Sequence, residues 1–236
     1  MTARAAISVV GMGGAIRPGS TSEKAFHWLM AALDERGVAT SVFTGLDLDF
    51  PLFNPNGGAS PDRRLDRFLA AIRHCDALVI SSPVYHGGPS GLVKNAIDHL
   101  QPLANDDRPY LTGRPVCCVA AGGGLPGAIS TLSALRDVVH ALRGWPTPMQ
   151  VPINSSSHPF DEQGSCSDTK LDHTLTAALD DLLGFAKAMH SSQVLAVRRP
   201  AMEPPKIMVV GSYNRDATLV VNRFPQPERR SPPEDQ

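Results

Sequence analysis

The chain has 236 residues, a length that suits one α/β domain. A domain of this size buries about 70% of the surface of its unfolded chain, so it needs no disulfide or metal for stability. Hydrophobic residues make up 42% of the chain and charged residues 19%, which argues against disorder along its whole length. With 22 basic and 23 acidic side chains the formal charge is −1, so no general field attracts nucleic acid or an anionic membrane surface.

Apolar runs of strand length alternate with segments of helical period, which predicts a parallel sheet with crossover helices. The predicted strands are residues 5–10, 39–44, 77–82, 116–121 and 149–153. The predicted helices run from about 22 to 37 and over 90–100, and three others carry apolar stripes at 65–72, 129–142 (Ile129 included) and 171–186. Residues 46–60, rich in Pro, Gly and Asn, are predicted to form a surface loop.

The number and order of these elements predict a flavodoxin-like, doubly wound sheet of five parallel strands in the order 2-1-3-4-5. A six-stranded doubly wound sheet fits the pattern less well. We assign this α/β domain to residues 1–193.

Residues 194–236 are predicted to be a separate proline-rich extension, since seven of the 21 prolines follow Arg199. Two short apolar runs on either side of residues 212–216 predict a C-terminal β-hairpin over about 206–224, and the end of the chain from 226 is predicted to be disordered. An isolated hairpin is only marginally stable in water, so we expect this one to dock on the domain or on a partner subunit.

The start of the chain and its cysteines bear on location. Residues 1–8 lead into the first strand without an apolar signal segment, and the longest apolar runs are far too short to cross a membrane. The four cysteines lack a Cys-x-x-Cys spacing and are interpreted as buried thiols, with the neighbours Cys117 and Cys118 on opposite faces of a strand. We expect a cytoplasmic, reduced protein.

Three loops with unusual chemistry leave strands one, three and four at the carboxyl edge of the sheet, where open parallel sheets bind ligands. The first, Gly11–Ser22, combines glycines, Arg17 and three hydroxyl groups ahead of a helix, which indicates a phosphate cradle. The alternative is a glycine-rich turn in which Ser20 or Ser22 caps the helix. The spacing matches neither a Walker loop nor a Rossmann fingerprint.

The second loop, Ser81–Gly91, holds two prolines and three glycines, and Tyr85 and His86 offer flat surfaces to a ring. The alternatives are surface packing for Tyr85, a solvent-facing His86, and an exposed ion pair for Lys94 and Asp98. The third loop contains Gly122–Gly124, whose N–H groups suit a planar ligand edge that gains negative charge, unless the loop is simply flexible. One anion cradle and two loops shaped for a flat ring match FMN best.

These motifs resemble the NAD(P)H-dependent FMN reductase family, which has a flavodoxin-like fold. The family's phosphate motif, Gly-Ser-x-Arg-x-x-Ser, appears here as Gly14–Ser20, and Ser82–Tyr85 followed by Ser90, Gly91, Lys94 and Asp98 is similar to the version in sulfonate-system FMN reductases. The triple glycine after the fourth strand is similar too. The resemblance covers about residues 5–154.

The resemblance implies that Arg17, Ser20 and Ser22 hold the phosphate, that the Pro83–Tyr85 segment lines the ring, and that the triple glycine meets its pyrimidine edge. The full set of predicted cofactor-binding residues is Gly14, Ala15, Arg17, Ser20, Thr21, Ser22, Pro83, Val84, Tyr85, His86, Gly122, Gly123 and Gly124. Ala15 departs from the family's serine, and the lost hydrogen bond is expected to weaken FMN binding by between about fivefold and a hundredfold unless Ser20–Ser22 compensate.

The predicted function is that of a flavin-dependent oxidoreductase, which passes a hydride from NAD(P)H to FMN and on to an acceptor such as a second flavin, a quinone or a small organic molecule. No catalytic dyad and no metal-ligand spacing is found in the sequence. The resemblance implies a homodimer or homotetramer.

Three alternatives stay open. The first is a tailored biosynthetic flavoenzyme that keeps FMN tightly bound and acts on a specific substrate. The second is a docked supplier of reduced flavin to a flavin-dependent monooxygenase. The third is a flavodoxin-like electron carrier, against which the near-neutral charge and Arg17 count.

Overall fold

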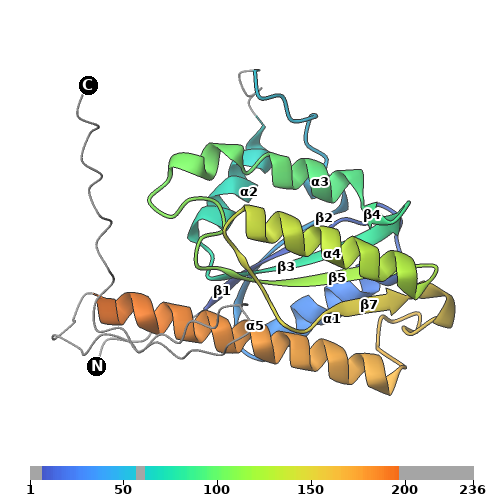
Figure 1. The fold of residues 1–236 in the computed structure, drawn as a ribbon. Helices are drawn as coiled ribbons and strands as arrows, with labels where there is room; N and C mark the ends of the chain where they lie inside the picture. Colours follow the sequence, from blue (N-terminus) through green and yellow to red (C-terminus); the bar gives the residue numbers. More distant parts are fainter. Residues whose placement is uncertain (1–6, 57–61, 197–236) are drawn as a thin grey trace, which may run out of the picture. The chain divides into compact units, whose positions relative to one another are not determined.

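The computed structural model describes residues 7–56 and 62–196, with side chains described as far as residue 190. A central sheet separates two helical layers: α2, α3 and α4 cover one face, and α1 and α5 cover the other (Figure 1). In chain order the elements are β1 (Ser8–Gly13), α1 (Thr21–Glu35), β2 (Ala39–Thr44), η1 (Gly45–Leu48), α2 (Arg63–His74), β3 (Ala77–Tyr85), β4 (Gly88–Pro89), α3 (Gly91–Asp98), η2 (Gln101–Asn105), β5 (Pro115–Gly122), α4 (Leu125–Ala141), β6 (Trp145–Pro146), β7 (Val151–Asn154), η3 (Ser155–Ser157) and α5 (Thr169–Ala196).

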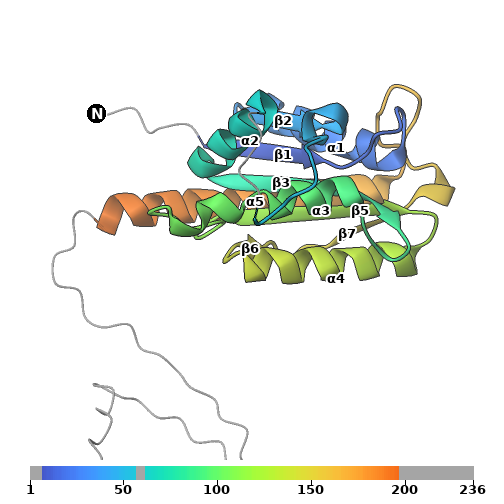
Figure 2. The same ribbon diagram turned by 90° about the horizontal axis from the view of Figure 1, so that it is seen from above.

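The strands lie side by side in the order β2, β1, β3, β5, and both β6 and β7 pair in parallel with β5 (Figure 2). The predicted doubly wound sheet and its 2-1-3-4-5 order are confirmed, with two differences. The fifth position holds two short strands, β6 and β7, instead of one, and residues 147–150 lie between them. In addition, β4 forms a short antiparallel pair with the end of β3.

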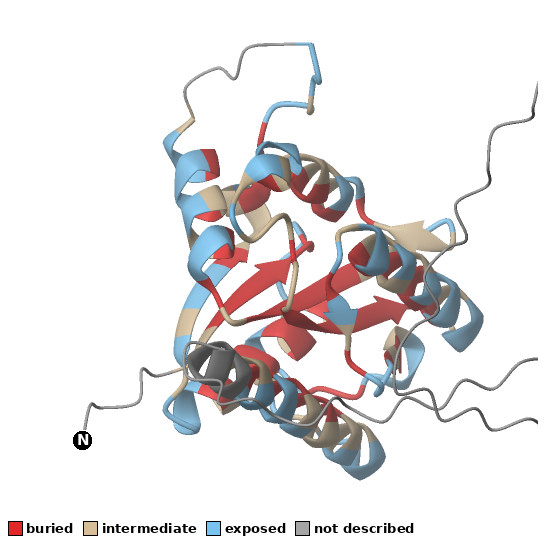
Figure 3. Cartoon of the chain, turned by 60° about the vertical axis from the view of Figure 1, so that its left-hand side comes forward, coloured by how far each residue is buried: buried red, intermediate tan, exposed pale blue. Residues whose placement is uncertain are grey.

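The central strands β1, β3 and β5 are largely buried, whereas the edge strand β2 is mostly exposed (Figure 3). The buried side chains of the sheet divide between two hydrophobic cores. Adjacent residues of a strand point to opposite faces. Cys118 accordingly packs in the core under α2, α3 and α4, whereas Cys117 packs in the core over α1 and α5. The predicted opposite orientation of these two thiols is confirmed.

The thiols differ sharply in accessibility. Burial raises the pKa of Cys75 to about 11 and that of Cys117 to about 12, and it also raises the pKa of Cys118. Only Cys166 is partly exposed. We therefore expect one thiol per chain to react with an aromatic disulfide reagent at pH 8 under native conditions, and four after denaturation. Rapid reaction of two or more thiols in the folded protein would contradict this arrangement of the cores.

The first strand runs farther than predicted, to Gly13 rather than Val10, so Gly11 and Gly13 are strand residues and not part of the loop. Their lack of a side chain serves helix packing: a Cβ at Gly11 would lie 2.5 Å from Met30 Sδ, and one at Gly13 would lie 3.0 Å from the Phe26 ring. The ligand-facing part of the loop therefore begins at Gly14.

Two further predictions need correction. Ile129, expected on the buried stripe of its helix, is 47% exposed on α4. The predicted surface loop at 46–60 begins with η1 and buries Leu48 and Phe50. In both cases the tertiary packing decides which apolar residues face the core, and composition alone does not reveal it.

Parts of two predictions lie outside the described residues: the first two residues of the strand expected at 5–10, and the C-terminal hairpin expected over 206–224. The boundary placed after residue 193 stays a prediction, and α5 runs on to Ala196. Among the described helices, none combines the length and the hydropathy needed to cross a membrane.

Candidate cofactor-binding site

The three loops singled out in the sequence all leave the sheet at its carboxyl edge, since β1, β3 and β5 are parallel neighbours. The β4 hairpin and the end of β7 mark this edge at the right of Figure 1. The predicted cofactor-binding residues are thus gathered at one edge by the strand order.

Gly14 joins the first loop to the second. Its N–H donates to the Ser81 carbonyl at 2.8 Å, and its own carbonyl accepts a hydrogen bond from Ser90 Oγ at 3.0 Å. A Cβ at Gly14 would overlap Val93 Cγ2 and lie 2.7 Å from Ser90 Oγ. The residue must be glycine for the N-terminus of α3 to approach the first loop this closely.

Beyond Gly14 the loop offers donors that the protein itself does not use. Ala15 is buried, yet within the described residues its N–H donates no hydrogen bond. Arg17 is exposed and takes part in no ion pair across residues 7–56 and 62–196. A backbone N–H of a buried residue that has no acceptor is rare in proteins, and here it lies two residues before Arg17, which makes no ion pair among the described residues. This combination fits an anionic group such as a phosphate.

The hydroxyl groups of this loop have structural duties as well. Ser20 caps α1, because its Oγ accepts from the Glu23 N–H at 3.4 Å, and Ser22 Oγ lies 3.4 Å from Ser20 Oγ. The capping alternative for Ser20 is therefore confirmed. The Glu23 carboxylate accepts from the Gly19 N–H, a favourable place for an acid at a helix N-terminus. Thr21 is the first residue of α1.

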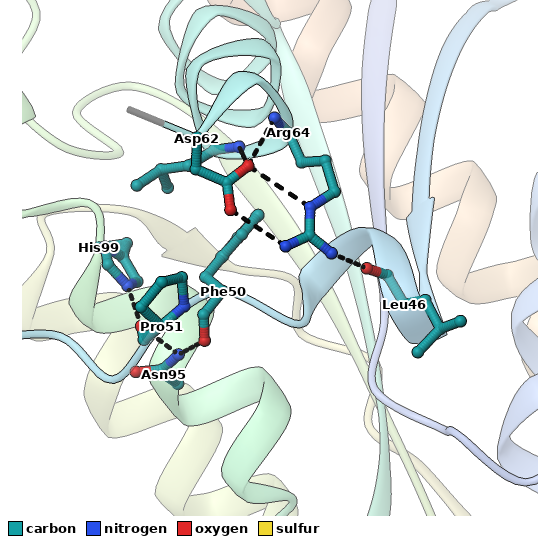
Figure 4. A network of polar contacts seen from close by, with 8 residues as sticks. Leu46, Phe50, Pro51, Asp62, Arg64, Asn95 and His99 are labelled. Carbon is teal, nitrogen blue, oxygen red and sulfur yellow. Dashed lines mark hydrogen bonds and ion pairs between the residues drawn. The ribbon is translucent and has the colours of Figure 1, made fainter. Parts of the chain in front are cut away.

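The segment after β2 borders the first loop and is held in place by α2 and α3 (Figure 4). Asn95 Nδ2 donates to the Phe50 carbonyl at 3.1 Å, and His99 Nε2 lies 2.8 Å from the Pro51 carbonyl oxygen. Arg64 donates to the Leu46 carbonyl at 3.0 Å while it pairs with Asp62. These contacts hold the segment after β2 against α2 and α3.

The second loop is a tight hairpin at the end of β3. His86 (φ 52°) and Gly87 (φ 78°) form its turn, and both Tyr85 and His86 point their side chains to solvent, Tyr85 being 58% exposed. Ser130 Oγ on α4 donates to the Gly87 carbonyl at 2.9 Å. Lys94 and Asp98 form the exposed ion pair considered from the sequence, with Nζ 2.7 Å from Oδ1.

Val84 connects the second loop to the third. A Cβ at Gly122 would lie 2.8 Å from Val84 Cβ, and one at Gly127 would lie 3.2 Å from Val84 Cγ1. Val84 is therefore packed against the glycines rather than held open for a ligand. Pro83, the residue before it, is half-buried and paired with Ala121.

The third loop leads into α4 with its backbone uncovered. No atom lies within 4 Å of a Cβ placed on Gly123, and Gly124 caps α4 without a side-chain hydrogen bond. The first N–H groups of a helix lack acceptors within it. Ser156 Oγ in η3 donates to the Gly123 carbonyl at 3.0 Å.

A serine hydroxyl thus holds one glycine carbonyl in each loop: Ser90 on Gly14, Ser130 on Gly87 and Ser156 on Gly123. Ser90 appears in the sequence motif, but Ser130 and Ser156 were not identified from the sequence. Their contacts reach 43 and 33 residues along the chain, and no local pattern signals them.

Two surface hollows of the described domain lie away from these loops. One, of about 480 Å³, lies between α1 and residues 163–166, and another, of about 380 Å³, lies between residues 36–38 and α5. Neither includes a predicted cofactor residue. We place the candidate site at the loop edge because its unused donors point to a ligand, which concavity alone does not. No three potential metal ligands gather within the described ranges.

A doubly wound parallel sheet with glycine-rich loops at its carboxyl edge is the architecture of flavodoxin-like proteins. Residues 7–158 match the model of one family in that class, the NADPH-dependent FMN reductases. The chain belongs to this family. The resemblance found in the sequence is confirmed, whereas the sulfonate-system subtype stays a prediction.

Similar proteins agree with this assignment. The FMN-dependent NADPH-azoreductase of Staphylococcus aureus (strain USA300) is 33% identical over 112 residues, or 47% of this chain and 56% of the azoreductase, so the match spans about half of each protein. Among solved structures, FerB, a flavoenzyme NAD(P)H:(acceptor) oxidoreductase from Paracoccus denitrificans, has a TM-score of 0.65 at 21% identity, covering 78% of this chain and 98% of FerB. RosB, solved with bound 8-demethyl-8-formylriboflavin-5'-phosphate, has a TM-score of 0.60 at 13% identity, covering 97% of this chain and 100% of RosB. These two structures show the shared fold.

Proposed function

We propose that this protein is an FMN-dependent oxidoreductase, which takes a hydride from NAD(P)H and delivers electrons to a flavin, a quinone or another small organic acceptor. The observation that supports this most strongly is the buried, unused Ala15 N–H beside the unpaired Arg17, in a chain of the FMN reductase family. We further propose a cytoplasmic homodimer or homotetramer.

The cofactor would supply the redox chemistry itself, accepting the hydride and giving up the electrons. The chain's own residues would bind and orient it. Arg17 and the Ala15 N–H would hold the phosphate, and the N–H groups after Gly123 would hold the pyrimidine edge. Tyr85, at the exposed end of β3, would cover part of the ring. No side chain is needed as an acid or base.

We expect the serine missing at position 15 to cost little. The backbone N–H of Ala15 is present whatever the side chain, and Ser20 and Ser22 stand with their hydroxyl groups at the start of the same helix. We therefore expect the loss of FMN affinity to be about fivefold, the smaller end of the range of losses estimated from the sequence.

The visible spectrum tests the proposal directly. We expect purified protein to shift the absorption bands of added FMN, and anaerobic NADPH to bleach them. A free-flavin spectrum that neither shifts nor bleaches at saturating NADPH and NADH would overturn the proposal, and the family membership would then describe the fold alone.

Replacing Arg17 tests the phosphate cradle. Because a charge-assisted hydrogen bond is worth about 1.5–3 kcal/mol, Arg17→Gln is expected to weaken FMN binding by about 10- to 100-fold, measured by quenching of flavin fluorescence. Riboflavin, which lacks the phosphate, is the matched control ligand, and its affinity should be the same for both proteins. An equal loss for FMN and riboflavin would place Arg17 elsewhere than at the phosphate.

The tailored biosynthetic flavoenzyme remains the second candidate, favoured by the ordered segment after β7. Phe160 is buried in the core with α1 and α5, and Lys24 Nζ donates to the Asp161 carbonyl at 2.6 Å. This segment gives the candidate site a fixed side wall next to the third loop. FMN retained through purification, together with slow NADPH oxidation in the absence of an organic substrate, would favour this candidate over a general flavin reductase.

A further inference from the structure

Ser156 holds the third loop from outside it. β7 ends at Asn154, which lies opposite Gly122 in the ladder, and the Asn154 side chain accepts a hydrogen bond from the Ser156 N–H at 3.0 Å. This bond turns the chain so that Ser156 Oγ reaches the Gly123 carbonyl at 3.0 Å. The end of β7 therefore places the Ser156 hydroxyl against the loop that follows the neighbouring strand, β5.

The bond to the Gly123 carbonyl determines where the next N–H points. In a planar trans peptide the C=O of one residue and the N–H of the next point in opposite directions, and the described chain contains no cis peptide bond. The Gly124 N–H is thus directed away from Ser156. It donates no hydrogen bond within the described residues.

The glycine loop has little else to fix this peptide. Neither Gly123 nor Gly124 has a side chain, and glycine adopts a wide range of backbone angles. A Cβ at Gly123 would meet nothing within 4 Å. Among the described residues, the Ser156 hydroxyl makes the one hydrogen bond to the peptide between Gly123 and Gly124.

We infer that Ser156 is a positioning residue that aims the Gly124 N–H at the pyrimidine edge of the flavin and so favours the reduced cofactor. This inference rests on the proposed function. Reduction places negative charge on the N1–C2=O2 edge, so an N–H held there binds reduced FMN more tightly than oxidised FMN. Ser156 thereby raises the reduction potential of bound FMN.

The adjacent serine provides a matched control. Ser157 is exposed like Ser156 and also donates to a carbonyl, that of Asn154 at 2.9 Å, but this bond stays within its own segment. Ser157→Ala therefore removes a comparable bond without touching the glycine loop. Ser156→Thr keeps a hydroxyl group and serves as the conservative variant.

The experiment measures the affinity for oxidised FMN by fluorescence quenching and the midpoint potential of bound FMN by spectroelectrochemistry. Ser156→Ala is expected to lower the preference for reduced over oxidised FMN by about fivefold, the usual worth of one hydrogen bond, which is a potential lower by about 20 mV. Ser157→Ala should leave the potential unchanged, and Ser156→Thr should restore most of the shift.

An unchanged potential in Ser156→Ala, or an equal shift in Ser157→Ala, would overturn the inference while leaving the proposed function intact. A wild-type protein that binds no FMN would instead overturn the proposed function. Far-ultraviolet circular dichroism of each variant shows that the fold is kept.

Discussion

Gly14→Ala is expected to weaken FMN binding by more than tenfold and to destabilise the domain by about 1–3 kcal/mol, the usual cost of inserting a methyl group into a packed site. The new Cβ would overlap Val93 Cγ2 and lie 2.7 Å from Ser90 Oγ. Val93 is fully buried, and a β-branched side chain has few rotamers into which it can retreat. The N-terminus of α3 must move instead, and its bond from Ser90 to the first loop is strained.

Urea unfolding and flavin titration measure the two effects of this change. Gly91→Ala is the matched control, since Gly91 begins the same helix and a Cβ there would meet nothing within 4 Å. The control should unfold at the same or a higher urea concentration than the wild type and bind FMN normally. If the two variants behave alike, the close approach of α3 to the first loop does not support the site.

Arg114→Met is expected to lower the free energy of unfolding by about 3–5 kcal/mol, a large share of the 5–15 kcal/mol that folded proteins have. Arg114 is fully buried, and its guanidinium donates to the carbonyls of Cys75 (3.1 Å), Tyr110 (2.8 Å) and Arg73 (2.6 Å). Methionine fills a similar space but leaves the carbonyls of Tyr110 and Arg73 without their donor, whereas Cys75 keeps a hydrogen bond from Arg108 at 3.1 Å. Each unpaired buried group costs about 1–3 kcal/mol. Burial lowers the pKa of Arg114, yet the group stays charged.

Thermal unfolding checks this prediction, with an expected fall in Tm of about 6–20 °C for a chain of this length. Arg63→Met, at an exposed position of α2, should change the stability by no more than about 0.5 kcal/mol. Because Arg114 precedes β5, at the edge opposite to the candidate site, the folded fraction of Arg114→Met should bind FMN with normal affinity. A stable Arg114→Met protein would show that the carbonyls of Tyr110 and Arg73 find other donors.

The architecture could be predicted because it depends on local patterns. The alternation of apolar runs and helical periods located five strand positions, and the order of the sheet follows from that alternation in doubly wound folds. The caps of α1 could also be predicted from the sequence: Ser20 is its N-cap, and Gly37, at φ 70°, follows its C-terminal end. The shared edge of the three loops then follows from parallel strands.

The parts that could not be predicted depend on contacts between distant residues. A fully buried arginine reads as a surface residue in any sequence pattern, so Arg114 gave no sign of its role. The glycines of β1 looked like loop residues, because the rings and sulfur they make room for lie on α1. The hydrogen bonds from Ser130 and Ser156 to the loops also join residues that are far apart in the sequence. Such contacts are decided by the folded backbone, and one sequence does not contain them as a pattern.

The serine hydroxyls that hold the three loops all donate hydrogen bonds to backbone carbonyls. Every amino acid has a backbone carbonyl, so the bond from Ser130 to the turn does not depend on which side chains the turn carries. Tyr85 at the exposed hairpin is therefore open to exchange without loss of the frame that carries it, whereas His86, at φ 52°, is restricted to residues that tolerate a left-handed backbone. Selection for a new electron acceptor would act most freely at Tyr85, while the hydrogen bonds that hold the loops stay unchanged.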